Sequence, residues 1–374
     1  MNPYVPGQPA TPGTFAGREA VLRRASEALE LASRLGRNSA LLLNGYRGSG
    51  KTSVLRKIEA LTLAARSDAI VVEIPLRIHS SEDRLLASVV QEVARQLEGR
   101  AGAGDRVRAF LSRVHGLSIA GTGVTLGASA ASRPTSGLAV WRECIDSLPD
   151  GSILLICVDD AELLDASGLG ALKTIAETHG RVPIVLIVAG GVELADRLSQ
   201  PSTSPIARVF SAGRFDIGEL SPSETGEALN APIRTADLQG GWTTDAIELV
   251  HRLSRGYPFL VQCLAHAAFI EGSTVEVARV QASVPEALEV GGSWLERECA
   301  SASDEDIRAF AKIADVGRPR LRSSEILSLG IQSPYIGRLV RQKILKKISR
   351  GQYELRKAPV IAYYHALARG LRLG

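Results

Sequence analysis

The sequence of 374 residues predicts an α/β protein with a parallel sheet, followed by a helical domain and a small helix-rich tail domain. Residues 153–158 and 184–189 are continuously apolar, which is typical of parallel strands buried on both faces. Between residues 18 and 215 such runs alternate with helix-like stretches, as they do in α/β folds. After Phe215 the pattern becomes helical.

Each element follows from its local pattern. Residues 18–35 place apolar side chains on one helical face and stop at Gly36. Residues 40–44 and 69–74 are short apolar runs and predict strands. Residues 51–65 and 82–97 predict helices between them. Strands and helices thus alternate in the order of a parallel sheet with crossover helices.

The chain divides into four predicted segments. Residues 116–130, rich in Gly, Ser and Thr, predict a β-hairpin or loop inserted in the core, or a disordered linker. Residues 1–14 have neither a basic region nor an apolar region of a signal peptide and predict a flexible arm. The segments are the arm (1–14), the α/β core (15–215), a helical domain (216–298) and the tail domain (299–374).

Composition excludes several classes of protein. With 45% hydrophobic residues, the chain is not disordered as a whole. No apolar run approaches the roughly 20 residues of a membrane span, so we expect no membrane association. The four cysteines are far apart and form no CxxC pair, which favours reduced thiols in the cytoplasm over disulfides or a zinc site.

Charge is distributed unevenly along the chain. The net charge is only +4, but residues 301–374 contain 15 Lys/Arg and 6 Asp/Glu, a charge of +9. The remaining 300 residues therefore carry −5. An acidic body with a basic tail is typical of an enzyme-like core joined to a nucleic-acid-binding module, although a basic surface can also be merely solvated.

One motif identifies a phosphate site. Residues 45–52, Gly-Tyr-Arg-Gly-Ser-Gly-Lys-Thr, match the P-loop pattern G-x-x-x-x-G-K-[ST] between a predicted strand and a predicted helix. The glycines let backbone N–H groups surround a phosphate, and the helix N-terminus attracts the same anion. Lys51 would bind the outer phosphates of ATP and the Thr52 hydroxyl would bind Mg²⁺. The predicted nucleotide-binding residues are Gly45, Tyr46, Arg47, Gly48, Ser49, Gly50, Lys51, Thr52 and Ser53.

A carboxylate pair follows another predicted strand. Asp159 and Asp160 come directly after the apolar residues 153–158. Asp159 would hold Mg²⁺ through water, and Asp160 would orient or deprotonate the attacking water, with Lys51 as its catalytic partner. Many P-loop ATPases have Glu at this second position. Asp160 is one methylene shorter, so it would position the attacking water more loosely and hydrolysis of ATP would be slow. Alternatively, the pair caps the next helix.

These motifs resemble a known family in their order. Phe-Ala-Gly-Arg-Glu at residues 15–19, the P-loop and the Asp159-Asp160 strand resemble AAA+ ATPases of the origin-recognition/initiator-like clade, which is related to the STAND signalling ATPases. The resemblance implies a P-loop NTPase sheet, a helical lid and a C-terminal winged helix. It also implies that residues 15–18 border the adenine.

The resemblance also extends to positions outside these motifs. It implies that Pro258, in a segment similar to the lid GxP motif, packs near the nucleotide. Arg208 and Arg214 lie where an arginine finger acting on a neighbouring subunit would be sought, although surface arginines fit as well. Residues 189–191, Ala-Gly-Gly, provide no polar sensor at the end of their strand. Many AAA+ relatives have a polar sensor residue at this position. Its absence here favours a switch that binds ATP and turns it over slowly.

The tail predicts a winged helix-turn-helix. Helices at 303–314, 323–329 and 333–343 are followed by a strand, a turn and a strand over 344–356. The third helix and the hairpin carry cations that would contact DNA phosphates with little sequence information. The predicted DNA-binding residues are Arg338, Arg341, Lys343, Lys346, Lys347 and Arg350.

Together these features predict an ATP- and Mg²⁺-dependent switch that binds double-stranded DNA through its tail. A homo-oligomer or a protein partner is compatible with them. The alternative is a STAND-like signalling or scaffold ATPase whose tail binds a protein partner. A small-molecule kinase is a weaker third interpretation, since no acceptor site is evident. A DNA-targeting ATPase of a mobile element or defence system would share the chemistry of the first.

Overall fold

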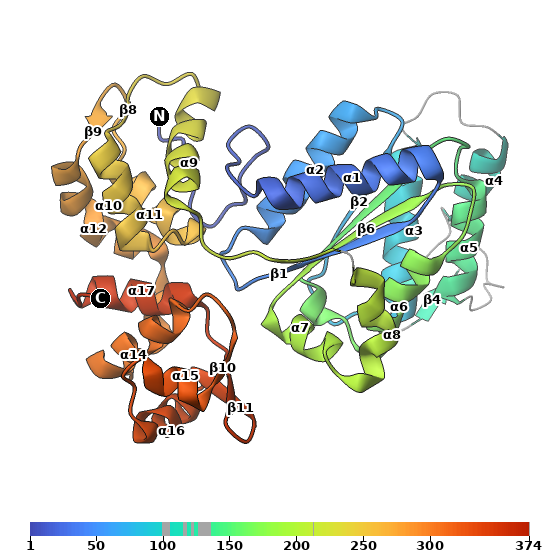
Figure 1. Cartoon of the computed structure of the whole chain (residues 1–374). Coiled ribbons are helices and arrows are strands. Elements are labelled where there is room, and N and C mark those ends of the chain that lie inside the picture. Colours follow the sequence, from blue (N-terminus) through green and yellow to red (C-terminus); the bar gives the residue numbers. More distant parts are fainter. Residues whose placement is uncertain (99–104, 115–117, 121–122, 126–135, 212, 374) are drawn as a thin grey trace. The chain divides into compact units, whose positions relative to one another are not determined.

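The computed structural model describes residues 1–98, 105–114, 118–120, 123–125, 136–211 and 213–373 (Figure 1). Contacts divide the chain into two compact units. The first, which we call the sheet unit, comprises Arg18–Gly45 and Val54–Asp216. The second, the tail unit, comprises Met1–Gly17, Tyr46–Ser53 and Ile217–Gly374.

The sheet unit is built on a five-stranded parallel sheet with the strand order β2-β5-β6-β1-β7. Every residue of β5 and β6 is buried, in agreement with their continuous apolar runs. The predicted parallel α/β fold is therefore confirmed. In sheet order the strands are Ile70–Pro75 (β2), Leu154–Asp159 (β5), Ile184–Gly190 (β6), Ser39–Asn44 (β1) and Arg214–Asp216 (β7).

Helices cover both faces of this sheet, as Figure 1 shows. α3 (Glu82–Glu98), α5 (Gly137–Ser147) and α6 (Ala166–Glu177) form one hydrophobic core with alternate strand residues. α1 (Glu19–Leu35) contacts β1 and β6 and lies with α2 (Lys51–Ala65) on the opposite face. The shorter helices are α4 (Asp105–Val114), α7 (Val192–Leu198), α8 (Ser204–Ala207) and the 3₁₀ turns η1 (Ala161–Leu163), η2 (Pro201–Thr203) and η3 (Arg208–Phe210).

The predicted insertion is described in part. β3 (Ser118–Ala120) and β4 (Gly123–Thr125) pair antiparallel, as in a hairpin. Residues 116–117, 121–122 and 126–130 of that prediction lie outside the described residues.

The tail unit begins with a group of helices. The predicted capping box is present: the Ser221 side chain accepts a hydrogen bond from the Glu224 backbone N–H, and the Glu224 carboxylate accepts one from Ser221. Two short strands, β8 (Gly241–Trp242) and β9 (Thr274–Val275), pair in parallel. The helices are α9 (Pro222–Thr235), α10 (Thr244–Ser254), α11 (Pro258–Ala268), α12 (Val277–Gly291) and α13 (Ser293–Arg297).

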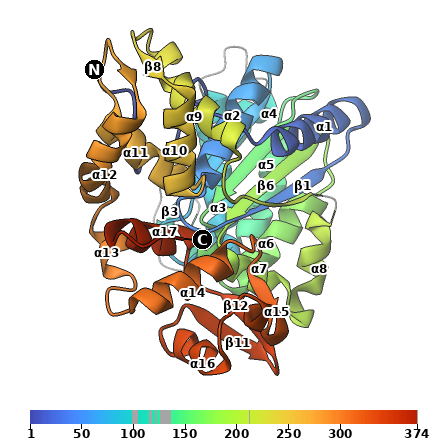
Figure 2. The same ribbon diagram turned by 60° about the vertical axis from the view of Figure 1, so that its left-hand side comes forward.

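The C-terminal elements follow the predicted order of three helices and a hairpin (Figure 2). One further strand, β10, pairs antiparallel with β12 and was not predicted from the sequence. The strand has only three residues, and two of them are exposed arginines. One hydrophobic core runs through these elements and the preceding helices, so contacts do not separate residues 299–373 from them. No helix among the described residues is long and apolar enough to cross a membrane. The elements are α14 (Asp304–Ala314), β10 (Arg320–Arg322), α15 (Ser323–Ser328), α16 (Ser333–Arg341), β11 (Leu345–Ser349), β12 (Gln352–Leu355) and α17 (Pro359–Ala368).

The first residues are anchored where the sequence predicts a flexible arm. Tyr4 is only 1% exposed and its ring meets those of Trp242 and Phe269 edge-on, with centroids 6.1 and 5.5 Å apart. Its hydroxyl donates to the Leu229 carbonyl and accepts from the Trp242 indole N–H at 2.8 Å. The absence of signal-peptide regions predicts a flexible arm here, but one aromatic side chain with satisfied polar atoms fixes the segment.

A half-buried carboxylate lies between α2 and the sheet. Burial and repulsion by Glu73 on β2 raise the pKa of Glu59 to about 7. Its buried Oε1 atom has no hydrogen-bond partner among the described residues. Because the pKa in the folded chain exceeds the ordinary value, ionisation of Glu59 opposes folding.

We expect Tyr4→Ala to destabilise the chain by about 3–5 kcal/mol, because it removes a buried aromatic ring. Tyr4→Phe should cost about 1–3 kcal/mol, since it leaves buried polar partners unsatisfied. Urea denaturation followed by tryptophan fluorescence measures both. The matched control is Val5→Ala, because Val5 is 55% exposed. A Tyr4→Ala variant as stable as the control would show that the segment is not anchored.

We expect Glu59→Gln to be more stable than the parent chain above pH 7. The raised pKa means that the parent loses stability as pH rises from about 4.5 to about 7, whereas the glutamine variant does not. Below pH 4.5 the difference should vanish. Denaturation midpoints across pH 4 to 8 measure it, and a difference that does not change with pH would contradict the expectation.

Candidate nucleotide site and basic surface

The sheet places the beginning of the P-loop. β1 ends at Asn44, and the Gly45 backbone N–H donates to the Gly190 carbonyl at 3.1 Å. Gly190 ends β6, which lies between β1 and β5. β5 ends at Asp159. Parallel strands bring their carboxyl ends to one edge, so the sheet unit holds Gly45 and Asp159 at the same edge.

The loop itself has the backbone that a phosphate site requires. Gly48 (φ 82°) and Gly50 (φ 95°) both adopt left-handed conformations that side chains disfavour. α2 begins at Lys51, so its N-terminal N–H groups follow directly. The Lys51 ammonium donates to the Tyr46 carbonyl at 3.3 Å, and so does the Ser49 backbone N–H at 3.3 Å. These residues fit a bound phosphate group.

Helix α11 begins beside this loop within the tail unit. The Tyr257 hydroxyl donates to the Arg47 carbonyl at 2.8 Å. A Cβ atom on Gly48 would lie 3.1 Å from Phe259 Cβ, so a side chain there would crowd Phe259, and the left-handed φ of 82° also favours glycine. Pro258 is the first residue of α11, between these two contacts. The structure thus brings the two neighbours of Pro258 into contact with the P-loop.

Two further contacts hold the loop in the tail unit. The Ser53 hydroxyl accepts a hydrogen bond from the Ala10 backbone N–H at 3.0 Å. The Tyr46 hydroxyl donates to the Leu355 carbonyl at 2.9 Å, at the end of β12. Nothing in the sequence signals either contact, since both join residues far apart in the chain.

The carboxylate pair at the end of β5 has two different environments. Asp159 is 3% exposed, whereas Asp160 is exposed and has a left-handed backbone (φ 54°). The Asp160 backbone N–H donates to Asp159 Oδ1 at 3.0 Å. Within the described residues 153–165, the Asp160 side chain does not cap the short helix η1. For Asp160, a side-chain cap of η1 is therefore not supported.

Glu162 is a polar residue of this edge that the sequence did not single out. Its carboxylate accepts a hydrogen bond from the Gly191 backbone N–H at 3.0 Å, directly after β6. Its own backbone carbonyl accepts from the Arg197 guanidinium at 3.1 Å. The only signal in the sequence is that Glu162 lies three residues after Asp159, within the short helix η1.

The two arginines considered as arginine fingers lie differently in the sheet unit. Arg208 is exposed and lines a hollow of about 440 Å³ together with Ser39 and Ala40, at the amino end of β1. Gly45 follows the other end of that strand. The Arg214 guanidinium donates to the Ala207 carbonyl at 2.5 Å. Arg208 is thus remote from the edge that carries Gly45.

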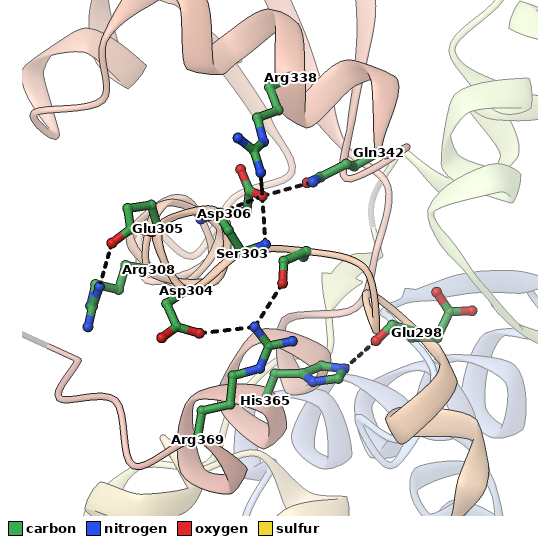
Figure 3. Close-up of polar contacts among 11 residues, drawn as sticks. Glu298, Ser303, Asp304, Glu305, Asp306, Arg308, Arg338, Gln342, His365 and Arg369 are labelled. Atoms are coloured by element: carbon green, nitrogen blue, oxygen red, sulfur yellow. Dashed lines mark hydrogen bonds and ion pairs between the residues drawn. The ribbon is translucent and has the colours of Figure 1, made fainter.

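In the tail unit, Arg338 is held by a buried carboxylate. Its guanidinium pairs with Asp306 Oδ2 at 2.8 Å, and the Gln342 amide donates to the same atom at 2.9 Å (Figure 3). Asp306 is fully buried and also closes a capping box with Ser303. Burial raises the pKa of Asp306, but the hydrogen bonds from Gln342 and Ser303 and the charge of Arg338 outweigh it and lower the pKa.

Several other arginines and lysines of the tail are also paired. Arg318 pairs with Glu325, and Arg320 and Arg356 pair with the buried Glu354. The five remaining predicted DNA-binding residues are exposed and have no ion-pair partner within the described residues. They are Arg341, Lys343, Lys346, Lys347 and Arg350. Unpaired positive charge is thus concentrated at the end of α16 and on the edge strand β11.

Comparisons with known proteins support the fold of the chain. Residues 14–188 match the family model described as an AAA ATPase domain. The Walker-type ATPase PABY2304 of Pyrococcus abyssi has a similar fold, with a TM-score of 0.54 and 18% identity over 96% of this chain and 98% of that one. The ORC2 protein of Aeropyrum pernix has a TM-score of 0.51 and 13% identity over 98% and 96%. No curated protein matches. Residues 14–188 are thus similar to AAA ATPase domains, and the chain has a P-loop NTPase fold of the Orc type.

Proposed function

We propose that the protein is an ATP-binding switch that hydrolyses ATP slowly. The observation that carries this proposal is the P-loop, whose two left-handed glycines and following helix have the backbone needed for a phosphate. The similar ORC2 structure is described as a complex with ADPNP and ADP, which supports an adenine nucleotide. Residues 15–18 would border the base.

Each polar residue has a separate role in this proposal. Mg²⁺, when bound, would supply charge neutralisation between the outer phosphates. Thr52 and Asp159 would hold it, and burial of Asp159 suits a carboxylate that faces a cation. Lys51 would bind the outer phosphates with its ammonium group. The exposed Asp160 would orient the attacking water and accept its proton.

We expect Asp160→Asn to retain ATP binding and to reduce ATP hydrolysis by about 10²-fold or more, because the amide cannot accept the proton. Phosphate release measures hydrolysis, and a fluorescent ATP analogue measures binding. Asp150→Asn is the matched control, since Asp150 is an exposed carboxylate of the same unit. Lys51→Ala should lose binding itself. Unchanged turnover by Asp160→Asn would remove Asp160 from this role.

We further propose that the tail is a winged helix that binds double-stranded DNA. Three helices, α14, α15 and α16, accompany a three-stranded antiparallel sheet whose β11–β12 hairpin forms the wing. Lys346, Lys347 and Arg350 lie on or at the end of β11 and are exposed. Exposed cations on and after an edge strand, without ion-pair partners among the described residues, suit contacts to phosphates.

Within this surface, Arg338 has a structural role in our proposal. Its guanidinium compensates the buried charge of Asp306 in an ion pair, so it is not available to bind a DNA phosphate in this arrangement. Gln342, a candidate for reading bases, is engaged by the same carboxylate. The contact with DNA therefore falls to Arg341 and Lys343 and to the cations of β11.

One observation favours the alternative function, a scaffold ATPase whose tail binds protein. The third helix of a winged helix reads DNA, yet Arg338 of α16 and Gln342, directly after α16, both bind Asp306 with their side chains (Figure 3). In either function, Arg208 is the better candidate for acting on a neighbouring copy in a homo-oligomer. It is exposed and remote from the edge that carries Gly45.

We expect Lys346→Ala/Lys347→Ala to weaken binding to duplex DNA and to reduce the slope of log affinity against log salt by about 0.9 for each lysine. Fluorescence anisotropy at several salt concentrations measures both. The control is Arg308→Ala/Arg318→Ala, which removes the same charge from exposed residues that are already ion-paired. Arg338→Ala should instead lower the stability of the tail, because Asp306 would be left buried and uncompensated.

Equal weakening by the control would mean that overall charge, and not this surface, attracts DNA. Absence of DNA binding at physiological salt, together with a stable protein partner in a pull-down, would favour the scaffold function.

A further inference from the structure

Tyr46 is in contact with two different parts of the tail unit at once. Its backbone carbonyl accepts hydrogen bonds from the Lys51 ammonium and the Ser49 N–H, both at 3.3 Å. Its hydroxyl donates to the Leu355 carbonyl at 2.9 Å. The main chain of Tyr46 is thus hydrogen-bonded to groups expected to bind phosphate, and its side chain is hydrogen-bonded to the last residue of β12.

The acceptor at the far end is firmly placed. Leu355 is 2% exposed, its N–H donates to the Pro319 carbonyl at 2.7 Å, and it pairs with Leu345 across the hairpin. The next residue, Arg356, donates its N–H to Ile344 at 2.9 Å. A displacement of this carbonyl therefore moves β12 and, through the ladder, β11.

The near end must change when a nucleotide binds. Lys51 has to direct its ammonium to an outer phosphate, and this competes with its hydrogen bond to the Tyr46 carbonyl. The Ser49 N–H belongs to the same phosphate-binding loop. Tyr46 is half-buried and packs against the hydrophobic core of the tail unit, so its ring cannot absorb the change by swinging into solvent.

We infer that Tyr46 is a positioning residue that couples nucleotide binding at the P-loop to the β11–β12 hairpin through its hydroxyl. The inference rests on the proposed function, because it assigns the regulation of the DNA-binding surface to this hydrogen bond. A single neutral hydrogen bond corresponds to an effect of about two- to tenfold on an equilibrium constant.

Two measurements test the coupling in the full-length protein. The first is hydrogen–deuterium exchange of peptides that cover residues 345–356, with and without saturating Mg²⁺ and the ATP analogue ADPNP. The second is the ratio of duplex DNA affinities under the same two conditions. Saturation is established separately for each variant, so that changes in nucleotide affinity do not enter the comparison.

Tyr46→Phe is the test variant and Tyr353→Phe is its matched control. Both changes remove one hydroxyl, but the Tyr353 hydroxyl, on β12 itself, has no hydrogen-bond partner among the described residues. In the parent chain and in Tyr353→Phe, we expect nucleotide to change exchange in 345–356 and DNA affinity by about two- to tenfold. In Tyr46→Phe both responses should vanish.

The outcomes separate the inference from the proposed function. If exchange responds to nucleotide in the parent and not in Tyr46→Phe, while no chain binds DNA, the coupling is supported and the DNA-binding proposal fails. If exchange in 345–356 does not respond in the parent, or responds equally in Tyr46→Phe, the inference is overturned whatever the DNA result.

Discussion

A phosphate-binding loop works only if its backbone is held in a conformation that most residues avoid. Here the left-handed φ angles of Gly48 and Gly50 are maintained by contacts along the whole loop. Gly45 is bonded to the end of β6, Tyr257 and Phe259 pack on Arg47 and Gly48, and α2 continues the chain from Lys51.

The parts of the fold that were predictable are those whose signal is local. The apolar runs of β5 and β6 indicate strands buried on both faces, and the P-loop residues carry their own conformational requirement. The anchoring of Tyr4 was not predictable, because its partners Leu229 and Trp242 are more than 200 residues away. Local composition cannot report on a contact that only the tertiary fold creates.

The same limit applied to the site. Asp159 and Asp160 were recognisable from their place after a strand, but the role of Glu162 depends on the position of Gly191, which the sequence does not give. Net charge located the basic tail, yet charge counts cannot separate paired from free groups. Only the contacts show that Arg338 compensates Asp306 while Lys346 and Lys347 have no such partner among the described residues.

The central strands and the P-loop differ in the groups through which they contact other elements. The end of β6 carries Ala189, Gly190 and Gly191, which offer no side-chain polar group there, and the Gly191 N–H is bonded to Glu162. A structural change that begins at the end of β6 would have to break backbone hydrogen bonds, because the Gly190 carbonyl and the Gly191 N–H are both paired. The P-loop has another connection, since Tyr46 contacts Lys51 with its main chain and Leu355 with its side chain. A hydrogen bond from the loop itself therefore provides a direct physical link to the basic hairpin within the tail unit.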